Sequence, residues 1–305
     1  MLGLNRDELF SLAIHLDLPD LLRLCASNKS IDRKLCSTDA IWNYKLQKEF
    51  PDYKNLNVNN KNKKEIYQLA YSLLQLKQKL KLEENIYELY FREYVDLRSE
   101  ELGELPKEIG VLTNLQDLNL ENNNLKELPK EIGNLINLKQ LTLNFNPLTE
   151  LPKELGDLIN LEQLMISNTK LVKIPKEIGN LAKLEWFYLY YSRLKTVPKE
   201  VGKLTNLKIL NLRNNQLTKI PRELGNLENL QPLFLTSNKL TEIPKEFGNL
   251  LNLKRLDLLG NKLREIPKEL GNLKNLEKLV LDENDLNKVP KELSEKKNLR
   301  IIGEK

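Results

Sequence analysis

The sequence predicts an α/β fold in which a solenoid of stacked repeats follows a small all-α domain. The first observation is a motif that returns every 23 residues without a slip, from Leu-Pro-Lys-Glu-Ile-Gly at 105–110 to Val-Pro at 289–290. The second is the alternation of leucine with polar residues inside each unit, which is typical of a strand. The third is a run of short helical patterns before residue 53. A period this strict indicates one supersecondary unit stacked on copies of itself.

The first domain, residues 1–53, is predicted to be helical. Asn5 with Glu8 three residues later matches a capping box, and apolar residues at helical spacing follow it. Further short helices are predicted from residue 20, over 30–36, and after the cap-like Ser-Thr-Asp at 37–39. Because four short helices form only a small core, part of their apolar surface is expected to need a partner.

Residues 54–90 are predicted to be a linker made of a loop and a helix. The stretch 55–64 is polar and rich in asparagine and lysine, which favours a loop and a domain boundary. From residue 66 to 80, apolar side chains recur at helical spacing. Three lysines between 77 and 81 could mark a membrane-surface helix, but two glutamates follow at once. We interpret the lysines as the solvated face of a helix that covers the end of the solenoid.

Residues 91–305 are predicted to be the solenoid, with eight complete turns and a parallel sheet on the concave face. In the turn at 109–120, Leu118 and Leu120 are predicted to lie on the strand, and residues 109–115 are predicted to form a helical or 3₁₀ segment that returns over the core. Degenerate turns are expected at both ends, with the pattern broken over 294–305. A column of asparagines is predicted to bond the backbone of neighbouring turns. Its members are Asn123, Asn146, Asn215, Asn238, Asn261 and Asn284, and Thr169 and Ser192 interrupt it.

Two resemblances to known families follow from these residues. From residue 91 on, the pattern Leu-x-x-Leu-x-Leu-x-x-Asn-x-Leu, seen at 115–125, resembles the leucine-rich-repeat family over about 210 residues. The first domain resembles the F-box family from Leu4 to Leu46, with Trp42 on its late tryptophan. It departs from that family at Asn5, where proline is usual, and at Ile31, where tryptophan is usual.

The F-box resemblance implies a partner for the first domain, the Skp1-type adaptor of a cullin ubiquitin ligase. The residues that it implies for adaptor binding are Leu4, Leu9, Phe10, Leu16, Pro19 and Leu22.

Information about a second partner is expected where the repeats differ, on the outward strand positions. The fourth turn stands out because Trp186, Tyr188, Tyr190 and Tyr191 fall within six residues, and aromatic and arginine side chains are the usual anchors of protein interfaces. Arg213 could hold a carboxylate of the partner. An alternative is that these turns have drifted and their aromatic side chains pack on one another. The predicted partner-binding residues are Met165, Trp186, Tyr188, Tyr190, Tyr191, Arg213, Phe234, Arg255 and Asp257.

Composition narrows the function. The 305 residues include 48 basic and 43 acidic side chains, a balance that argues against nucleic-acid binding. No apolar run is long enough to span a bilayer, and charged residues near the start argue against a signal peptide. The chain is therefore expected in the cytoplasm, with Cys25 and Cys36 as buried reduced thiols. His15 is the only histidine, so no metal site is expected.

These observations favour a binding protein. With no glycine-rich phosphate loop and no nucleophile elbow, the sequence predicts neither an enzyme nor a cofactor. The leading interpretation is a substrate-recognition adaptor of a Skp1-cullin-type ligase, in a eukaryote or in the host cytoplasm of a large DNA virus. The alternative is a non-ligase scaffold whose N-terminal helices only cap the solenoid.

Overall fold

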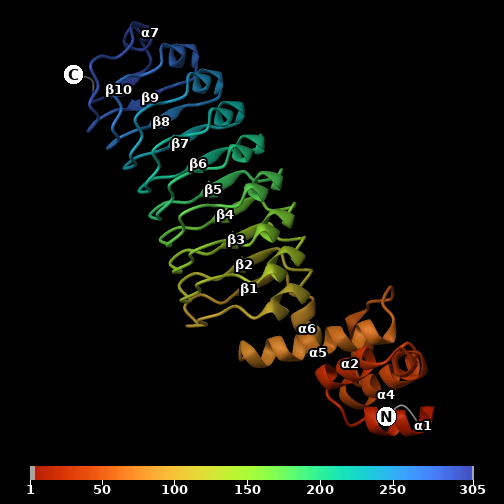
Figure 1. Cartoon of the computed structure of the whole chain (residues 1–305). Coiled ribbons are helices and arrows are strands. Elements are labelled where there is room, and N and C mark those ends of the chain that lie inside the picture. Colours follow the sequence, from red (N-terminus) through yellow and green to blue (C-terminus); the bar gives the residue numbers. More distant parts are fainter. Residues whose placement is uncertain (1–3, 304–305) are drawn as a thin grey trace. The chain divides into compact units, whose positions relative to one another are not determined.

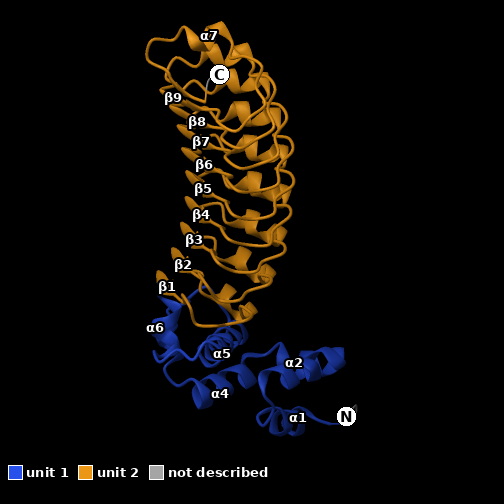
Figure 2. Cartoon of the chain, turned by 90° about the vertical axis from the view of Figure 1, so that its left-hand side faces the viewer, with its two compact units in different colours: residues 1–92 blue, residues 93–305 orange. Residues whose placement is uncertain are grey.

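The computed structural model describes residues 4–303. Residues 1–3 and 304–305, which begin the first predicted domain and end the last, lie outside the described residues. The chain divides into two compact units, residues 1–92 and residues 93–305, which Figure 2 colours separately. We call them unit 1 and unit 2.

Unit 1 is helical, as the sequence of residues 1–53 predicts. Its segments are α1 (Arg6–Ala13), α2 (Leu18–Ser27), α3 (Lys29–Ile31), a π-helical turn (Asp32–Cys36), α4 (Asp39–Glu49), a 3₁₀ turn (Tyr53–Leu56), α5 (Lys63–Lys79) and α6 (Ile86–Tyr90). The predicted capping box of α1 is confirmed, because the Glu8 amide donates to Asn5 Oδ1 at 3.0 Å and the Asn5 amide donates to Glu8. Thr38 precedes α4, but its side chain does not cap the helix as predicted. Its hydroxyl instead donates to the Leu35 carbonyl.

The core of unit 1 lies where α4 packs against α5. The rings of Trp42 and Tyr67 are 5.9 Å apart, and both side chains are buried. The Tyr67 hydroxyl donates to Glu49 at 2.6 Å, and burial, followed by that hydrogen bond, raises the pKa of Tyr67 far above its usual value. Lys45 is also buried, and it donates to Glu49 and to the Leu16 carbonyl. A buried ammonium is tolerated here because both contacts compensate for its lost hydration.

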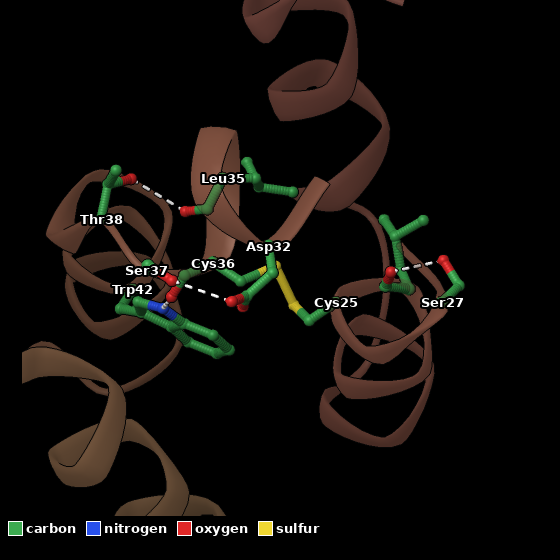
Figure 3. The surroundings of a disulfide bond; sticks show 9 residues. Cys25, Ser27, Asp32, Leu35, Cys36, Ser37, Thr38 and Trp42 are labelled. Carbon is green, nitrogen blue, oxygen red and sulfur yellow. Dashed lines mark hydrogen bonds between the residues drawn. A yellow bond between two sulfur atoms is a disulfide. The ribbon is translucent and has the colours of Figure 1, made fainter. Parts of the chain in front are cut away.

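The two cysteines are joined, which corrects the prediction of reduced thiols. Figure 3 shows the Cys25–Cys36 disulfide between α2 and the π-helical turn, with Trp42 beside it. The Cα atoms are 5.9 Å apart, a separation that a disulfide spans. The prediction was wrong because it inferred the redox state from an assumed compartment. The sequence separation of 11 residues could not show that the fold brings the two side chains together.

Unit 2 is the predicted solenoid. Within residues 4–303, ten strands form one parallel sheet in chain order (Figure 1). Paired residues of neighbouring strands are 23 positions apart in the sequence. Between β9 and β10 they are 22 positions apart. The strands are β1 (Tyr94–Asp96), β2 (Asp117–Asn119), β3 (Gln140–Thr142), β4 (Gln163–Met165), β5 (Trp186–Tyr188), β6 (Ile209–Asn211), β7 (Pro232–Phe234), β8 (Arg255–Asp257), β9 (Lys278–Val280) and β10 (Arg300–Ile302). The fold class predicted for this part of the chain is therefore confirmed.

Short helical segments form the opposite side of unit 2. Figure 2 shows the strands along one side of this unit, which curves inward, and the helical segments along the other. Each segment follows a proline, which loses no hydrogen bond there because a first-turn amide has no helical partner. The segments are the 3₁₀ helices Lys107–Val111, Lys130–Asn134, Lys153–Asp157, Lys176–Asn180, Lys199–Lys203, Arg222–Asn226, Lys245–Asn249 and Lys268–Asn272, followed by α7 (Lys291–Ser294).

The end turns keep more structure than the sequence predicts. Residues 94–96 and 300–302 both pair as strands, although the repeat pattern fails around them. Parallel pairing needs only backbone amides and carbonyls, so a turn can lose its consensus side chains and still extend the sheet. The exit turn is atypical as expected, since its strand pairs at a spacing of 22 residues in place of 23, yet it still extends the sheet.

The predicted asparagine column is confirmed by its hydrogen bonds. Asn146 Nδ2 donates to the carbonyls of Leu120 and Leu143 at 2.8 and 3.1 Å. Its Oδ1 accepts from the amides of Asn123 and Leu125, both at 3.0 Å. One buried amide group therefore satisfies backbone groups from two consecutive turns. At the interruption of the column, the hydroxyls of Thr169 and Ser192 bond to each other at 2.8 Å.

Candidate functional site

The strand face of unit 2 is hollowed over β5 to β8. Side chains alternate along each strand, so Phe187 and Leu189 enter the core while Tyr188 and Tyr190 face outward. The outward side chains enclose a hollow of about 580 Å³, which we call the concave hollow. It is lined by Tyr188, Tyr190, Tyr191, Asn211, Arg213, Asn214, Thr236, Ser237, Arg255, Asp257 and Leu259.

Two arginines share one aromatic ring at this hollow. The guanidinium carbon of Arg213 lies 4.0 Å from the centroid of the Phe234 ring, and that of Arg255 lies 5.2 Å from it. Arg255 also donates to Asp257 at 2.9 Å, and Asp257 accepts a second hydrogen bond from Thr236 at 2.7 Å. The carboxylate of Asp257 is therefore already engaged by its neighbours.

Arg213 has no such carboxylate. Among the described residues its guanidinium forms no ion pair, and its Nε atom is buried without a hydrogen-bond partner. Stacking does not block the in-plane N–H groups of a guanidinium, because the ring covers only its face. The concave hollow thus presents one positive charge that no protein group neutralises.

Tyrosines form the other wall of the concave hollow. The rings of Tyr190 and Tyr191 meet edge to face at 5.8 Å. Burial, followed by the proximity of Tyr190, raises the pKa of the half-buried Tyr188. The Tyr188 phenol is therefore neutral at neutral pH and can donate a hydrogen bond.

Most of the predicted partner-binding residues come together here. Six of them line the concave hollow, and Phe234 lies beneath the two arginines. Met165 and Trp186 do not line it. Both are half-buried on β4 and β5, and Trp186 is covered by Lys208, whose ammonium lies 5.5 Å from the ring and 2.7 Å from Glu185.

Sequence reasoning missed the neutral residues of the lining. Asn211, Thr236 and Leu259 stand in the same outward columns as the predicted residues, and this position was the only signal that could have identified them. Asn214 and Ser237 follow the strands at positive φ and gave no signal of their own. The alternative of aromatic side chains packing on one another describes the Tyr190–Tyr191 pair but not Tyr188 or Phe234.

Of the predicted adaptor-binding residues of unit 1, Leu9 and Phe10 lie on α1, Pro19 and Leu22 lie on α2, and Leu4 and Leu16 lie before and after α1. Leu9 is only 2% exposed, so it belongs to the core of unit 1 and not to a contact surface, which corrects that assignment. Pro19 is exposed, and partial exposure is shared by Leu4, Phe10, Leu16 and Leu22. Leu12, which was not among them, is 52% exposed on α1.

Two negative findings concern residues 4–303. No cluster of three or more His, Cys, Asp or Glu side chains is arranged there to hold a metal ion. No helix in the same range is both long and apolar enough to cross a membrane.

Comparisons with known proteins agree with the geometry of unit 2. A family model described as a leucine-rich repeat region matches residues 66–165, 130–210 and 195–304. A leucine-rich-repeat protein of Leptospira interrogans has a similar structure, with a TM-score of 0.64 and 38% identity over 75% of this chain and 57% of that one. The chain thus spans less than two thirds of that protein. The comparison with curated proteins found no match.

Two plant receptors are similar as well. The Arabidopsis receptor kinase HAESA, solved with a peptide hormone and a co-receptor, has a TM-score of 0.63 and 30% identity over 77% of this chain and 45% of that one. The ectodomain of the Arabidopsis receptor kinase GASSHO1, solved with Casparian strip integrity factor 2, has a TM-score of 0.61 and 35% identity. That alignment covers 66% of this chain and 25% of the receptor.

Proposed function

This chain belongs to the leucine-rich-repeat family, and on that premise we propose that it is a recognition protein whose concave hollow holds an acidic segment of a partner protein. The fold itself is one that serves protein–protein interaction. The structures of HAESA and GASSHO1 contain a bound peptide hormone or protein factor, which supports a polypeptide as the partner. No catalytic role is part of the proposal.

The observation that carries the proposal is the unneutralised guanidinium of Arg213 on Phe234. A carboxylate can bond two guanidinium N–H groups at once, and such charge-assisted pairs are stronger than neutral hydrogen bonds. Arg255 adds a second cation that Asp257 compensates, so the charged side chains of the hollow sum to a net positive charge. The Tyr188 and Tyr190 rings offer apolar contact area beside that charge, which suits a peptide side chain next to an aspartate or glutamate.

A peptide selection on the full chain tests this role. A phage-displayed library of random 12-residue peptides is selected on the immobilised protein, and the recovered peptides are synthesised and titrated. We expect an excess of aspartate and glutamate, and at least a tenfold loss of affinity for Arg213→Gln and Tyr188→Ala, which corresponds to about 1.4 kcal/mol.

Leu251→Asn is the matched control, because Leu251 is an exposed apolar residue of unit 2 outside the concave hollow. It should leave the titrations unchanged. Recovered peptides without acidic residues, or equal binding by Arg213→Gln, would refute the role of the concave hollow.

We further propose that unit 1 docks onto a Skp1-type adaptor, which would make the bound protein a substrate of a cullin ubiquitin ligase in the cytoplasm. Support comes from the F-box resemblance of residues 4–46 and from apolar side chains on α1 and α2. Leu12 and Pro19 are exposed, and Phe10, packed edge to face against Tyr44, is partly exposed. A small helical unit that leaves such residues uncovered suits a partner surface.

The alternative, a scaffold with no ligase partner, is favoured by the Cys25–Cys36 disulfide. Disulfides persist in oxidising compartments and are rare in the cytosol, where cullin ligases act.

Co-purification separates the two roles. The full chain and its Leu12→Asp variant are mixed with a purified Skp1-like adaptor, with the disulfide intact and after reduction. Retention of the reduced wild type and loss of Leu12→Asp support the ligase role. No retention in either redox state, or equal retention of both proteins, contradicts it.

A further inference from the structure

The edge of unit 2 that follows the strands carries two aromatic residues in an unfavourable backbone conformation. The same position of successive turns lies at positive φ, and it is asparagine at 122, 168 and 214, serine at 99 and 237, glycine at 260 and glutamate at 283. Phe145 and Tyr191 occupy the same position at φ 56° and 52°. Asparagine tolerates this left-handed region, whereas a bulky side chain there is unusual.

Core packing does not explain these two residues. Phe145 is 55% exposed and Tyr191 is 56% exposed, so more than half of each residue's surface faces solvent. The two large rings therefore lie in a conformation that the turns on either side fill with asparagine, and neither belongs to the core. Such a combination points to a partner that covers them.

The two rings border a second hollow, of about 520 Å³, which we call the edge hollow. Asn168 lies in the turn between them, and the hydrogen-bonded hydroxyls of Thr169 and Ser192 also line it. This is the place where the asparagine column is interrupted.

The edge hollow is positively charged. Lys170 and Arg193 line it, both are exposed, and neither forms an ion pair among the described residues. No aspartate or glutamate occurs in residues 163–176 or 186–199, which contain the two turns that carry these cations. The charge therefore favours an acidic occupant.

We propose that the edge hollow docks an acidic polypeptide segment, with an apolar side chain inserted between Phe145 and Tyr191 and carboxylates on Lys170 and Arg193. A hollow of this size with one pair of rings fits a single side chain and its neighbours. A nucleic acid duplex or a membrane surface would instead require a longer run of cations. This site lies beyond the concave hollow and does not depend on it, although Tyr191 lines both.

The test uses Phe145→Asn, because asparagine is the residue that neighbouring turns have at this position. The variant should melt at the same temperature as the wild type or higher, since it relieves the positive-φ conformation. Random 12-residue peptides on phage are selected on the full wild-type chain after depletion on Phe145→Asn. The recovered peptides should be acidic, should contain an aromatic or aliphatic residue, and should bind Phe145→Asn at least tenfold more weakly.

Arg213→Gln and Leu251→Asn serve as controls. Peptides of the edge hollow should bind both variants as they bind the wild type, so loss of the concave site and loss of this site are distinguishable. The proposal is overturned if depletion leaves no acidic peptides, or if the recovered peptides do not distinguish Phe145→Asn from the wild type. It is also overturned if a 12-nucleotide thymidine strand or phosphatidylserine vesicles bind in a Phe145-dependent way while the peptides do not.

Discussion

Single side chains hold each turn of unit 2 to the next, and the asparagine column shows the principle. The primary amide of Asn146 has two donors and one acceptor oxygen, which matches the carbonyls and amides that a sharply bent backbone leaves unpaired. Thr169 and Ser192 have only a hydroxyl each; the two hydroxyls bond to each other, and Thr169 also accepts from the Leu171 amide at 3.4 Å. At the interruption the side chains of the column therefore bond fewer backbone groups than an asparagine does.

The first prediction compares Asn146→Ala with Ser192→Ala. Asn146 is fully buried and satisfies backbone groups on two turns, so its removal should lower the unfolding free energy by about 2–4 kcal/mol. Ser192 makes a single side-chain bond at a partly exposed site, and its removal should cost about 1 kcal/mol or less. Urea denaturation followed by circular dichroism measures both. Equal losses would show that the column does not carry this stability.

The second prediction concerns Tyr67 and alkaline pH. Its pKa is raised in the folded state, so above about pH 10 the unfolded chain ionises while the folded chain holds the proton. The stability that the neutral phenol contributes is complete below pH 10 and falls as pH rises further. The difference in unfolding free energy between the wild type and Tyr67→Phe should therefore shrink by about 1.4 kcal/mol per pH unit above pH 10.

Fluorescence of Trp42 reads this unfolding in a Trp186→Phe background, because the two tryptophans lie one in each unit. A difference that stays constant from pH 8 to 11 would contradict the raised pKa.

Residues differ in how far the sequence could predict them. The position of Asn146 follows from a strict period, and the outward positions of Tyr188 and Arg213 follow from alternation along a strand. The stacking of Arg213 and Arg255 on Phe234 could not be predicted, because it depends on rotamers selected by three neighbouring turns. Leu9 was assigned to adaptor binding through the F-box resemblance, which does not tell which apolar side chains of α1 the unit buries in its own core.

At the scale of elements, local signals predicted the starts of helices better than they predicted pairing. Asn5 begins α1 with the predicted capping box, a signal contained within four residues. Asn62 begins α5 in the same way, but that start was missed because residues 55–64 were predicted to be a loop. The strand β10 could not be predicted, since its pairing with β9 uses backbone groups that any residue supplies. The disulfide between α2 and the π-helical turn could not be predicted either, because it depends on how close the fold brings the two cysteines.

The third prediction is that the disulfide stabilises unit 1 alone. Closing a loop of about 11 residues restricts the unfolded chain by about 3 kcal/mol in the chain-entropy description. Cys25→Ser with Cys36→Ser should therefore lower the unfolding free energy read by Trp42 by roughly that amount. The transition read by Trp186 in a Trp42→Phe background should not shift when the wild-type disulfide is reduced. A shift of both transitions would mean that the two units unfold together.

At the scale of the whole molecule, the sequence predicts the architecture of unit 2 almost completely and its binding properties only in part. Repetition carries the fold, because each turn buries its leucines against an identical neighbour. Departures from repetition locate the concave hollow and the edge hollow, in turns where aromatic and cationic residues replace the consensus. What each hollow can bind depends on which of its charged side chains have no partner of opposite charge after folding. For Arg213 and Asp257 this follows from their contacts in the structure, which the sequence does not reveal.

The most direct measurement is a charge reversal at Arg213, read by isothermal titration calorimetry on the full chain. Two peptides are compared: the tightest acidic 12-residue peptide recovered for the concave hollow, and its counterpart with lysine at every acidic position. The wild type should bind the acidic peptide at least tenfold more tightly, and Arg213→Glu, which makes the charged side chains of the hollow net negative, should reverse this order. If both proteins rank the two peptides in the same order, Arg213 does not determine recognition and the proposed role of the concave hollow is wrong.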